Sequence, residues 1–117
     1  MGFLDIVDAA GQPGHPTGTD AVIDYIVRPG EAGQGVGTAT ARALLHAAFD
    51  GLGLRRVTAA ANADNAASVR VLERVGMRCE RVSRKALWHR QLGWVDEVGY
   101  ALLGEEWEAT ERYPLSV

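Results

Sequence analysis

The stretch VRPGEAGQGVGTA, residues 27–39, decides how this chain is organised. The segment before it, AVIDYIV at residues 21–27, is rich in β-branched residues and is followed closely by a proline, which is typical of a strand. After it, small and apolar residues recur at helical spacing, at Val36, Thr40, Ala43, Leu44 and Ala47. The sequence therefore predicts a strand, a glycine-rich turn and a helix in succession.

A glycine-rich turn at the start of a helix suits an anion. The first N–H groups of the helix have no partner within it, and the helix dipole adds positive potential there. Gly35 and Gly37 let the backbone approach a phosphate closely, because they carry no Cβ to intrude. We therefore expect the loop to bind phosphate or pyrophosphate through its backbone. The residues predicted for this are Gly33, Gln34, Gly35, Val36, Gly37 and Thr38.

Two other phosphate-binding motifs fit this loop poorly. A P-loop needs Lys-Ser or Lys-Thr after its last glycine, whereas Thr38 and Ala39 follow Gly37. The dinucleotide fingerprint G-x-G-x-x-G needs a different glycine spacing, and it needs an acidic residue at the end of the next strand, where Asn62 stands. An ordinary glycine-rich connection with no ligand stays open as an alternative.

A second segment, NADNAASVRVLERVGM at residues 62–77, follows the short predicted strand Arg55–Ala61. Together the two segments resemble the GNAT superfamily of N-acetyltransferases, and most closely the branch that acetylates N-terminal amines of ribosomal proteins. That family's loop reads Arg/Gln-x-x-Gly-x-Gly/Ala. Its next strand is followed by Asn-x-x-Ala/Ser and by a helix that ends at Gly-Phe or Gly-Met. The likeness covers roughly residues 21–107 and keeps the order and spacing of both motifs.

The pattern of elements predicts an α/β (α+β) fold with a mixed, mostly antiparallel sheet flanked by helices, in the order β-β-α-β-α-β-β. The whole chain, residues 1–117, is expected to be one domain. The strand at Arg55–Ala61 should run parallel to Ala21–Val27 because a helix makes the crossover between them. The other expected strands are Phe3–Ala9, Met77–Arg90 and Trp94–Leu103.

Two helices and a final helical turn are expected. The first runs from Val36 to Phe49, and the last turn begins at residues 105–107. Asp64 or Asn65 can cap the second helix, and Gly76 ends it. The buried stripe of this second helix is expected to consist of Ser68, Val71, Leu72 and Val75.

The resemblance implies acetyl-CoA as cosubstrate and no metal. In the family, the end of the strand matching residues 21–27 splays from its neighbour, and pantetheine inserts like an extra strand. The resemblance implies that the backbone of Ile26, Val27 and Arg28 binds pantetheine in this chain. Asn65 would bind the pantetheine chain with its side-chain amide. The alternatives are a closed sheet and an asparagine that only caps the helix.

At the two positions where the family often has its proton-transfer residues, this sequence has Leu72 and Val22. Many family members have a tyrosine where Leu72 stands, so Ser68, one turn earlier, is the nearest hydroxyl to protonate the CoA thiolate. The related branch often carries a glutamate where Val22 stands, and Asp24 lies on the same strand face. Asp24 is therefore the candidate base, and Ser68 the candidate acid. A solvated aspartate and a serine bonded to the helix backbone are the alternatives.

Composition favours a globular protein of the cytoplasm. The net charge of −3, with both signs interspersed, gives no electrostatic case for nucleic-acid binding. Cys79 is the single cysteine, which excludes an internal disulfide and suits a reducing compartment. No segment is long and apolar enough to span a membrane.

The family's fold normally begins with a strand, two helices and another strand, whereas only about 20 residues precede the matched strand here. Those elements usually build the acceptor side, so a homodimer is expected to cover the exposed surface. A natural short form, a truncation and completion by a second copy all stay open. The function expected is acetyl transfer from acetyl-CoA to a primary amine, either a protein N-terminus or a small amine. The alternative is a non-catalytic CoA-binding or structural module.

Overall fold

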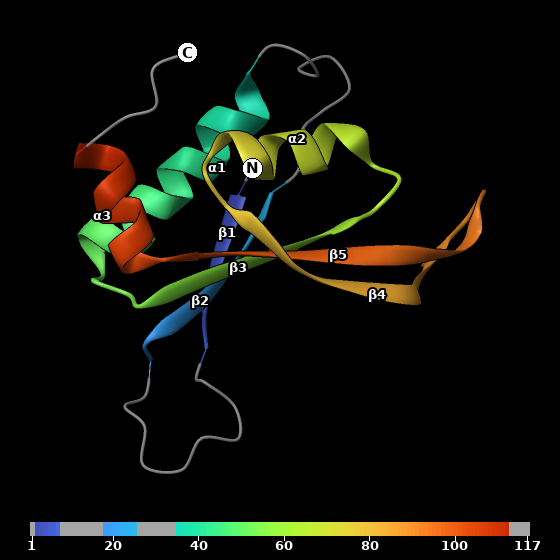
Figure 1. Ribbon diagram of the computed structural model, residues 1–117, viewed down its shortest axis with the longest axis horizontal. Coiled ribbons are helices and arrows are strands. Elements are labelled where there is room, and N and C mark those ends of the chain that lie inside the picture. Colours follow the sequence, from blue (N-terminus) through green and yellow to red (C-terminus); the bar gives the residue numbers. More distant parts are fainter. Residues whose placement is uncertain (1, 8–17, 26–34, 113–117) are drawn as a thin grey trace.

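The computed structural model describes residues 2–7, 18–25 and 35–112 (Figure 1). Within these ranges the strands and helices follow the predicted order, and a π-helical turn, Ala47–Gly51, extends the first helix. The last helix has nine residues and is longer than the single turn expected from the sequence. The elements are β1 (Gly2–Val7), β2 (Asp20–Tyr25), α1 (Val36–His46), β3 (Arg56–Asn62), α2 (Ala66–Arg74), β4 (Arg78–His89), β5 (Gly93–Leu103) and α3 (Gly104–Arg112).

All of these strands belong to one sheet with the order β1-β2-β3-β5-β4. The β1–β2, β3–β5 and β4–β5 pairs are antiparallel, and the β2–β3 pair is parallel. The mixed, mostly antiparallel α+β fold is therefore confirmed. The parallel pair is the one that α1 connects, as a crossover connection requires.

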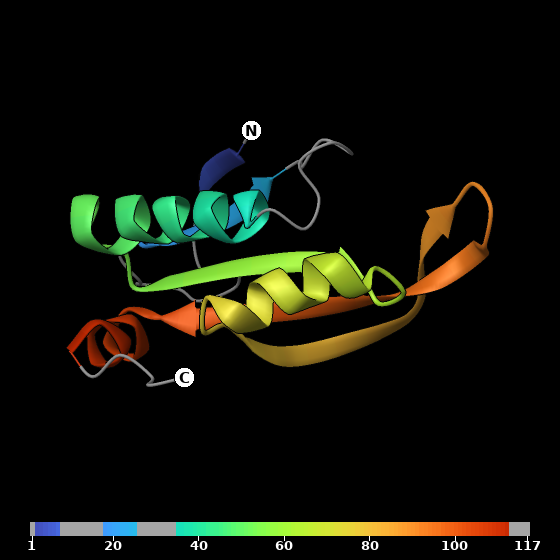
Figure 2. The same cartoon turned by 90° about the horizontal axis from the view of Figure 1, so that it is seen from above.

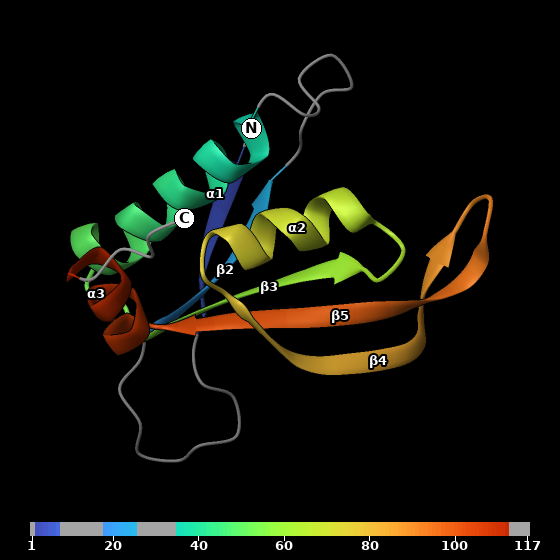
Figure 3. The same ribbon diagram turned by 45° about the horizontal axis from the view of Figure 1, so that its top comes forward.

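The helices pack on one face of this sheet (Figures 2 and 3). Leu45 of α1 and Leu72 of α2 are fully buried there against Val57 of β3 and Leu102 of β5. Trp107 of α3 completes the core, since its ring stacks on Phe49 with 5.7 Å between centroids. Alternate strand residues point to the opposite face, which no helix covers within the described part of the chain.

Local signals in the sequence explain where α2 begins and ends. Asn65 caps the helix, because its side-chain oxygen accepts a hydrogen bond of 3.1 Å from the Ser68 N–H. Gly76 follows the helix with φ at 94°, a conformation that glycine adopts without strain. In the predicted stripe, Leu72 and Val75 are buried, whereas Ser68 and Val71 are half-buried. The two ends of α2 therefore lie where the sequence predicts them.

Candidate active site

The parallel strands β2 and β3 part halfway along their length. Their register holds three pairs, of which Val22–Thr58 is the last. Beyond it, β3 continues to Asn62 and keeps its β5 partner at every position. In Figure 3 the carboxyl ends of β2 and β3 point in clearly different directions. The splay implied by the family resemblance is therefore present in the described part of these strands.

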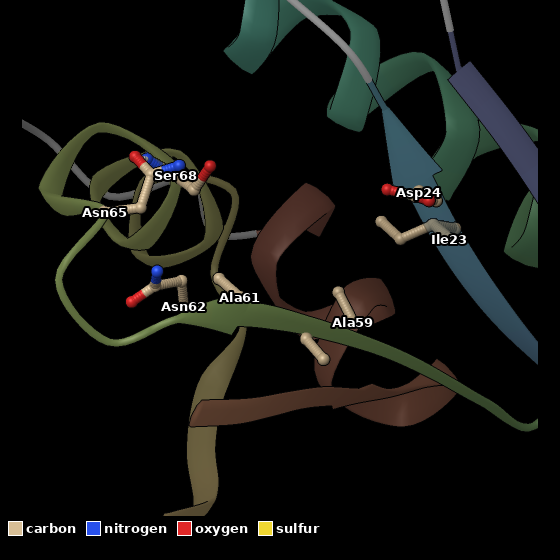
Figure 4. Close-up of a pocket in the computed structure, with 8 residues that line it drawn as sticks. Ile23, Asp24, Ala59, Ala61, Asn62, Asn65 and Ser68 are labelled. Carbon is tan, nitrogen blue, oxygen red and sulfur yellow. Dashed lines mark hydrogen bonds between the residues drawn. The ribbon is translucent and has the colours of Figure 1, made fainter. Parts of the chain in front are cut away.

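A cavity of about 210 Å³ occupies the space between the parted strands (Figure 4). Ala59 and Ala61 form part of its floor, and their methyl groups leave room that larger residues would fill. Ile23 of β2 closes the side nearest the core, where it is almost fully buried. The complete lining consists of Ile23, Asp24, Ala59, Ala60, Ala61, Asn62, Asn65 and Ser68.

The wall that α2 contributes is held in place by its first turn. The Asn65 side chain caps the helix through its oxygen, and its NH₂ group has no hydrogen-bond partner within the described residues. Asn62 fixes the preceding turn by accepting a hydrogen bond of 2.8 Å from the Asp64 N–H. Asn65 therefore caps the helix and also lines the cavity, and its binding of pantetheine stays a prediction.

The predicted proton-transfer residues lie on opposite walls of this cavity. Asp24 belongs to β2 and is exposed, whereas Ser68 belongs to α2 and is half-buried. Figure 4 shows Asp24 across the cavity from Asn65 and Ser68. The fold thus brings together three predicted site residues from two segments that are about 40 positions apart in the chain.

The start of α1 has the geometry expected of an anion site. Gly35 is its N-cap residue, with φ at 77°, and no side chain caps the helix. A Cβ built on Gly35 would meet no atom within 4 Å, so the space beside it is open. Gly37 is buried, and the buried Thr38 hydroxyl has no hydrogen-bond partner within the described residues. The predicted residues Ile26, Val27, Arg28, Gly33 and Gln34 lie outside the described ranges.

The residues of the cavity floor are not among the site residues predicted from the sequence. Ala59, Ala60 and Ala61 follow one another in β3, and Asn62 ends the strand. Alanine is a poor strand former, so three in succession at the end of a core strand are a signal that space is needed there. That signal was present in the sequence, but only the parting of β2 showed which edge of β3 needed the space.

A second cavity of about 360 Å³ lies on the opposite face of the sheet. It shares Ala59 and Ala60 with the first cavity, at the point where β2 and β3 part. Glu80 in its wall forms hydrogen bonds with Arg56 and Arg78, and these bonds lower its pKa to about 2. A carboxylate with so low a pKa is a weak base, so Glu80 is unsuited to accepting an amine proton.

The described residues offer neither a metal centre nor a membrane span. In the described ranges, no group of three or more His, Cys, Asp or Glu side chains is arranged to hold a metal ion. No helix in those ranges is long and apolar enough to cross a membrane. The described residues form a cavity between two strands, and the N-terminus of α1 has no side-chain cap.

Known proteins resemble this chain in sequence and in fold. The family model described as an acetyltransferase (GNAT) domain matches residues 1–78. An uncharacterized N-acetyltransferase of Bacillus subtilis, YnaD, is 33% identical over 85 residues, which are 73% of this chain and 49% of that protein. The chain thus spans about half the length of this curated relative.

Two solved structures have the same fold. RimJ of Mycobacterium smegmatis, in complex with CoA-disulfide, is 28% identical with a TM-score of 0.66, and the match covers 84% of this chain and 44% of RimJ. The ribosomal-protein-S5-alanine acetyltransferase of Vibrio fischeri is 21% identical with a TM-score of 0.69, covering 76% of this chain and 48% of that one. The second likeness concerns the fold alone. The family match over residues 1–78, with the parted parallel strands, shows that this chain belongs to the GNAT acetyltransferase family.

Proposed function

We propose that this protein transfers an acetyl group from acetyl-CoA to a primary amine, either a protein N-terminus or a small amine. The observation that carries the proposal is the parting of β2 and β3 after Val22–Thr58, with a cavity between them. An extended pantetheine arm, which contains two amides, can hydrogen-bond to strand edges that have no strand partner. The GNAT family, to which the chain belongs, uses acetyl-CoA.

The start of α1 supports binding of the CoA pyrophosphate. Its free N–H groups and the dipole of the helix favour an anion. Gly35 leaves open space at this point, and α1 has no acidic residue in its first turn to repel a phosphate. In the proposed complex the pyrophosphate lies at the amides of residues 33–38, and pantetheine runs from there into the strand gap.

The proposed reaction is direct nucleophilic attack of the amine on the thioester of acetyl-CoA. The amine nitrogen forms a bond to the thioester carbonyl carbon, the carbon–sulfur bond breaks, and CoA leaves as a thiolate. A backbone N–H among residues 26–28 would stabilise the carbonyl oxygen as it gains negative charge. Asp24 would accept the amine proton through a water molecule, and Ser68 would supply a proton to the thiolate. Both side chains belong to the walls of the same cavity.

Binding is tested by thermal stabilisation. CoA should raise the melting temperature, and pantetheine, which lacks the pyrophosphate, should raise it far less. In a Gly35→Val variant most of the gain should disappear because the side chain fills the phosphate's space. Gly53→Val is the matched control, since Gly53 also has a positive φ (64°) and open surroundings. Equal stabilisation of both variants by CoA would contradict the assignment.

Catalysis is tested by release of free CoA thiol from acetyl-CoA in the presence of a panel of amines. One observation favours the second candidate, a CoA-binding module without catalysis. Leu72, at the position where many family members carry a tyrosine, is fully buried in the core and offers no proton donor. Stabilisation by CoA without turnover on any amine would support that module, whereas amine-dependent thiol release would support the transferase.

A further inference from the structure

The loop end of the β4–β5 hairpin extends beyond the rest of the sheet (Figure 1). The pairing of β3 with β5 ends at Asn62–Glu97, so the hairpin continues past it as a ribbon of two strands. We call residues 84–94 the hairpin tip. Trp88 and Trp94 pair across this ribbon with their rings 5.3 Å apart, and both remain more than half exposed, as does Leu92. In the described part of the chain, no helix or further strand covers these exposed aromatic rings, which is unusual for a ribbon of two strands.

The hairpin tip is also basic. Arg84, Lys85 and Arg90 are all exposed, and residues 84–94 contain no acidic side chain. Two carboxylates border the tip: Asp96 accepts a hydrogen bond of 2.8 Å from the Lys85 N–H and lies 4.0 Å from the Arg84 Nε, and Asp64 lines a cavity together with Lys85 and Trp94. The tip therefore combines positive charge with exposed aromatic surface.

An acidic surface lies at the opposite edge of the sheet, on strands β1 and β2. In their antiparallel register Asp5 faces Val22, and Phe3 faces Asp24, so these side chains share the face that no described helix covers. Neither strand contains a basic residue. We define the edge face by the exposed side chains of Phe3, Asp5, Val7, Val22 and Asp24.

The two surfaces complement each other but cannot meet within one molecule. The sheet order β1-β2-β3-β5-β4 puts β1 and β4 at opposite edges, with β3 and β5 between them. A contact between two copies can satisfy both surfaces at once, because a twofold axis repeats every contact in the reverse direction. We propose that this chain forms a homodimer in which the hairpin tip of each copy lies on the edge face of the other.

The contact has a consequence for the active site. Val22 and Asp24 of the edge face also border the gap between β2 and β3. The partner's hairpin tip would therefore add an aromatic wall beside the site of acetyl transfer. This consequence rests on the proposed function, whereas the dimer does not. A dimer without turnover would overturn the transferase alone, and turnover by a monomer would overturn the dimer alone.

A pair of charge reversals tests the contact by sedimentation equilibrium. The tip variant is Arg84→Glu with Arg90→Glu, and the edge variant is Asp5→Lys. Each homodimer then has like charges at both contacts, so its dissociation constant should rise on the order of tenfold or more. A mixture of the two variants should restore the affinity of the parent. In one contact of that mixed dimer, the introduced glutamates of the tip variant face the introduced lysine of the edge variant. In the other contact, the original arginines face the original Asp5.

The matched control reverses two arginines away from both surfaces. Arg42 and Arg70 are exposed on α1 and α2, and their reversal should leave the dissociation constant unchanged. Far-UV circular dichroism should show that every variant is folded. Iodide quenching gives an independent measurement. Dilution of the parent should expose Trp88 and Trp94 to quenching, while Trp107 stays protected in the core.

Four results would overturn the proposal. The first is a parent that is monomeric throughout the micromolar range. The second is a dimer that the tip and edge variants do not weaken. The third is a mixture that fails to regain affinity, and the fourth is a control variant that dissociates as readily as the tip variant.

Discussion

The two edges of β3 differ in how far they are paired. Along the β5 edge, all seven residues of β3 have an antiparallel partner, from Arg56–Leu103 to Asn62–Glu97. Along the β2 edge, three residues of β3 are paired with the described part of β2, and a cavity opens beyond them. One strand therefore serves two purposes. Its β5 edge contributes to the stability of the fold, and its β2 edge borders the cavity that the proposed function assigns to pantetheine. Substitutions on the two sides should accordingly change different measured quantities.

The largest effect on stability is expected on the β5 side. Leu102 is fully buried opposite Val57, so Leu102→Ala removes core contacts and leaves a cavity behind. The free energy of unfolding should fall by about 2–5 kcal/mol, as measured by urea denaturation. The CoA affinity of the molecules that remain folded should change by no more than about twofold, because the two edges act separately. A large loss of CoA affinity in the folded variant would show that the two edges of β3 do not act separately.

On the β2 side, Asp24→Asn should change the rate of reaction and leave the fold intact. If Asp24 is the general base, turnover should fall on the order of 100-fold. The rate should also lose its rise with pH across the titration of the base. Thermal stabilisation by CoA should match that of the parent, because the variant keeps the strand gap. A change in rate of less than about threefold would instead favour a site that works by positioning alone.

Two neighbouring alanines of β3 allow its cavity-facing side to be compared with its exposed face. Ala61 points into the cavity, so Ala61→Leu should weaken CoA binding about 10- to 100-fold by filling the space for pantetheine. Ala60 borders the same cavity, but strand alternation points its side chain to the opposite, exposed face, so Ala60→Leu should leave CoA binding near the parent value. Isothermal titration of both variants measures the difference. Equal affinities would show that CoA does not use the gap.

The smallest effect concerns the ion pairs that join β3 to β4. Arg56 and Arg78 lower the pKa of Glu80 to about 2, from 4.5. A carboxylate with a lowered pKa stabilises the fold above its unfolded pKa, and this contribution is lost as the pH falls through the folded value. Glu80→Gln should therefore reduce the free energy of unfolding by about 1 kcal/mol or less at pH 7, because these groups are partly exposed.

The difference in free energy of unfolding between the parent and Glu80→Gln should depend on pH, and this dependence checks the prediction. The difference should be constant above a pH of about 4.5 and should shrink toward zero as the pH approaches 2. Urea denaturation of both proteins at several pH values measures it. A difference that stays unchanged between pH 7 and pH 2 would show that the ionised carboxylate is not its source.

The sequence by itself determined the order of elements and the ends of the second helix. Period-2 and period-3.6 patterns depend on neighbouring residues, so they could be read before any contact was known. Asn65 as a cap and Gly76 as a terminator follow from local hydrogen bonding and backbone freedom. The family motifs at residues 27–39 and 62–77 indicated the GNAT family in the same way. The last helix was expected only as a single turn beginning at residues 105–107, whereas it spans Gly104–Arg112.

Only the tertiary structure decided which groups share the site. Asp24 and Ser68 are 44 positions apart, and they line one cavity because α1 crosses over and sets β3 beside β2. The alanines of β3 indicate that space is needed near its end, but neither strand's sequence says that β2 and β3 part after Val22–Thr58. In the fold β2 packs against α1, and β3 packs against α2. The opposed characters of the hairpin tip and the edge face likewise became visible only when the sheet order put β1 and β4 at opposite edges. Local patterns depend on neighbours in the chain, whereas a strand gap and a surface depend on contacts between distant segments.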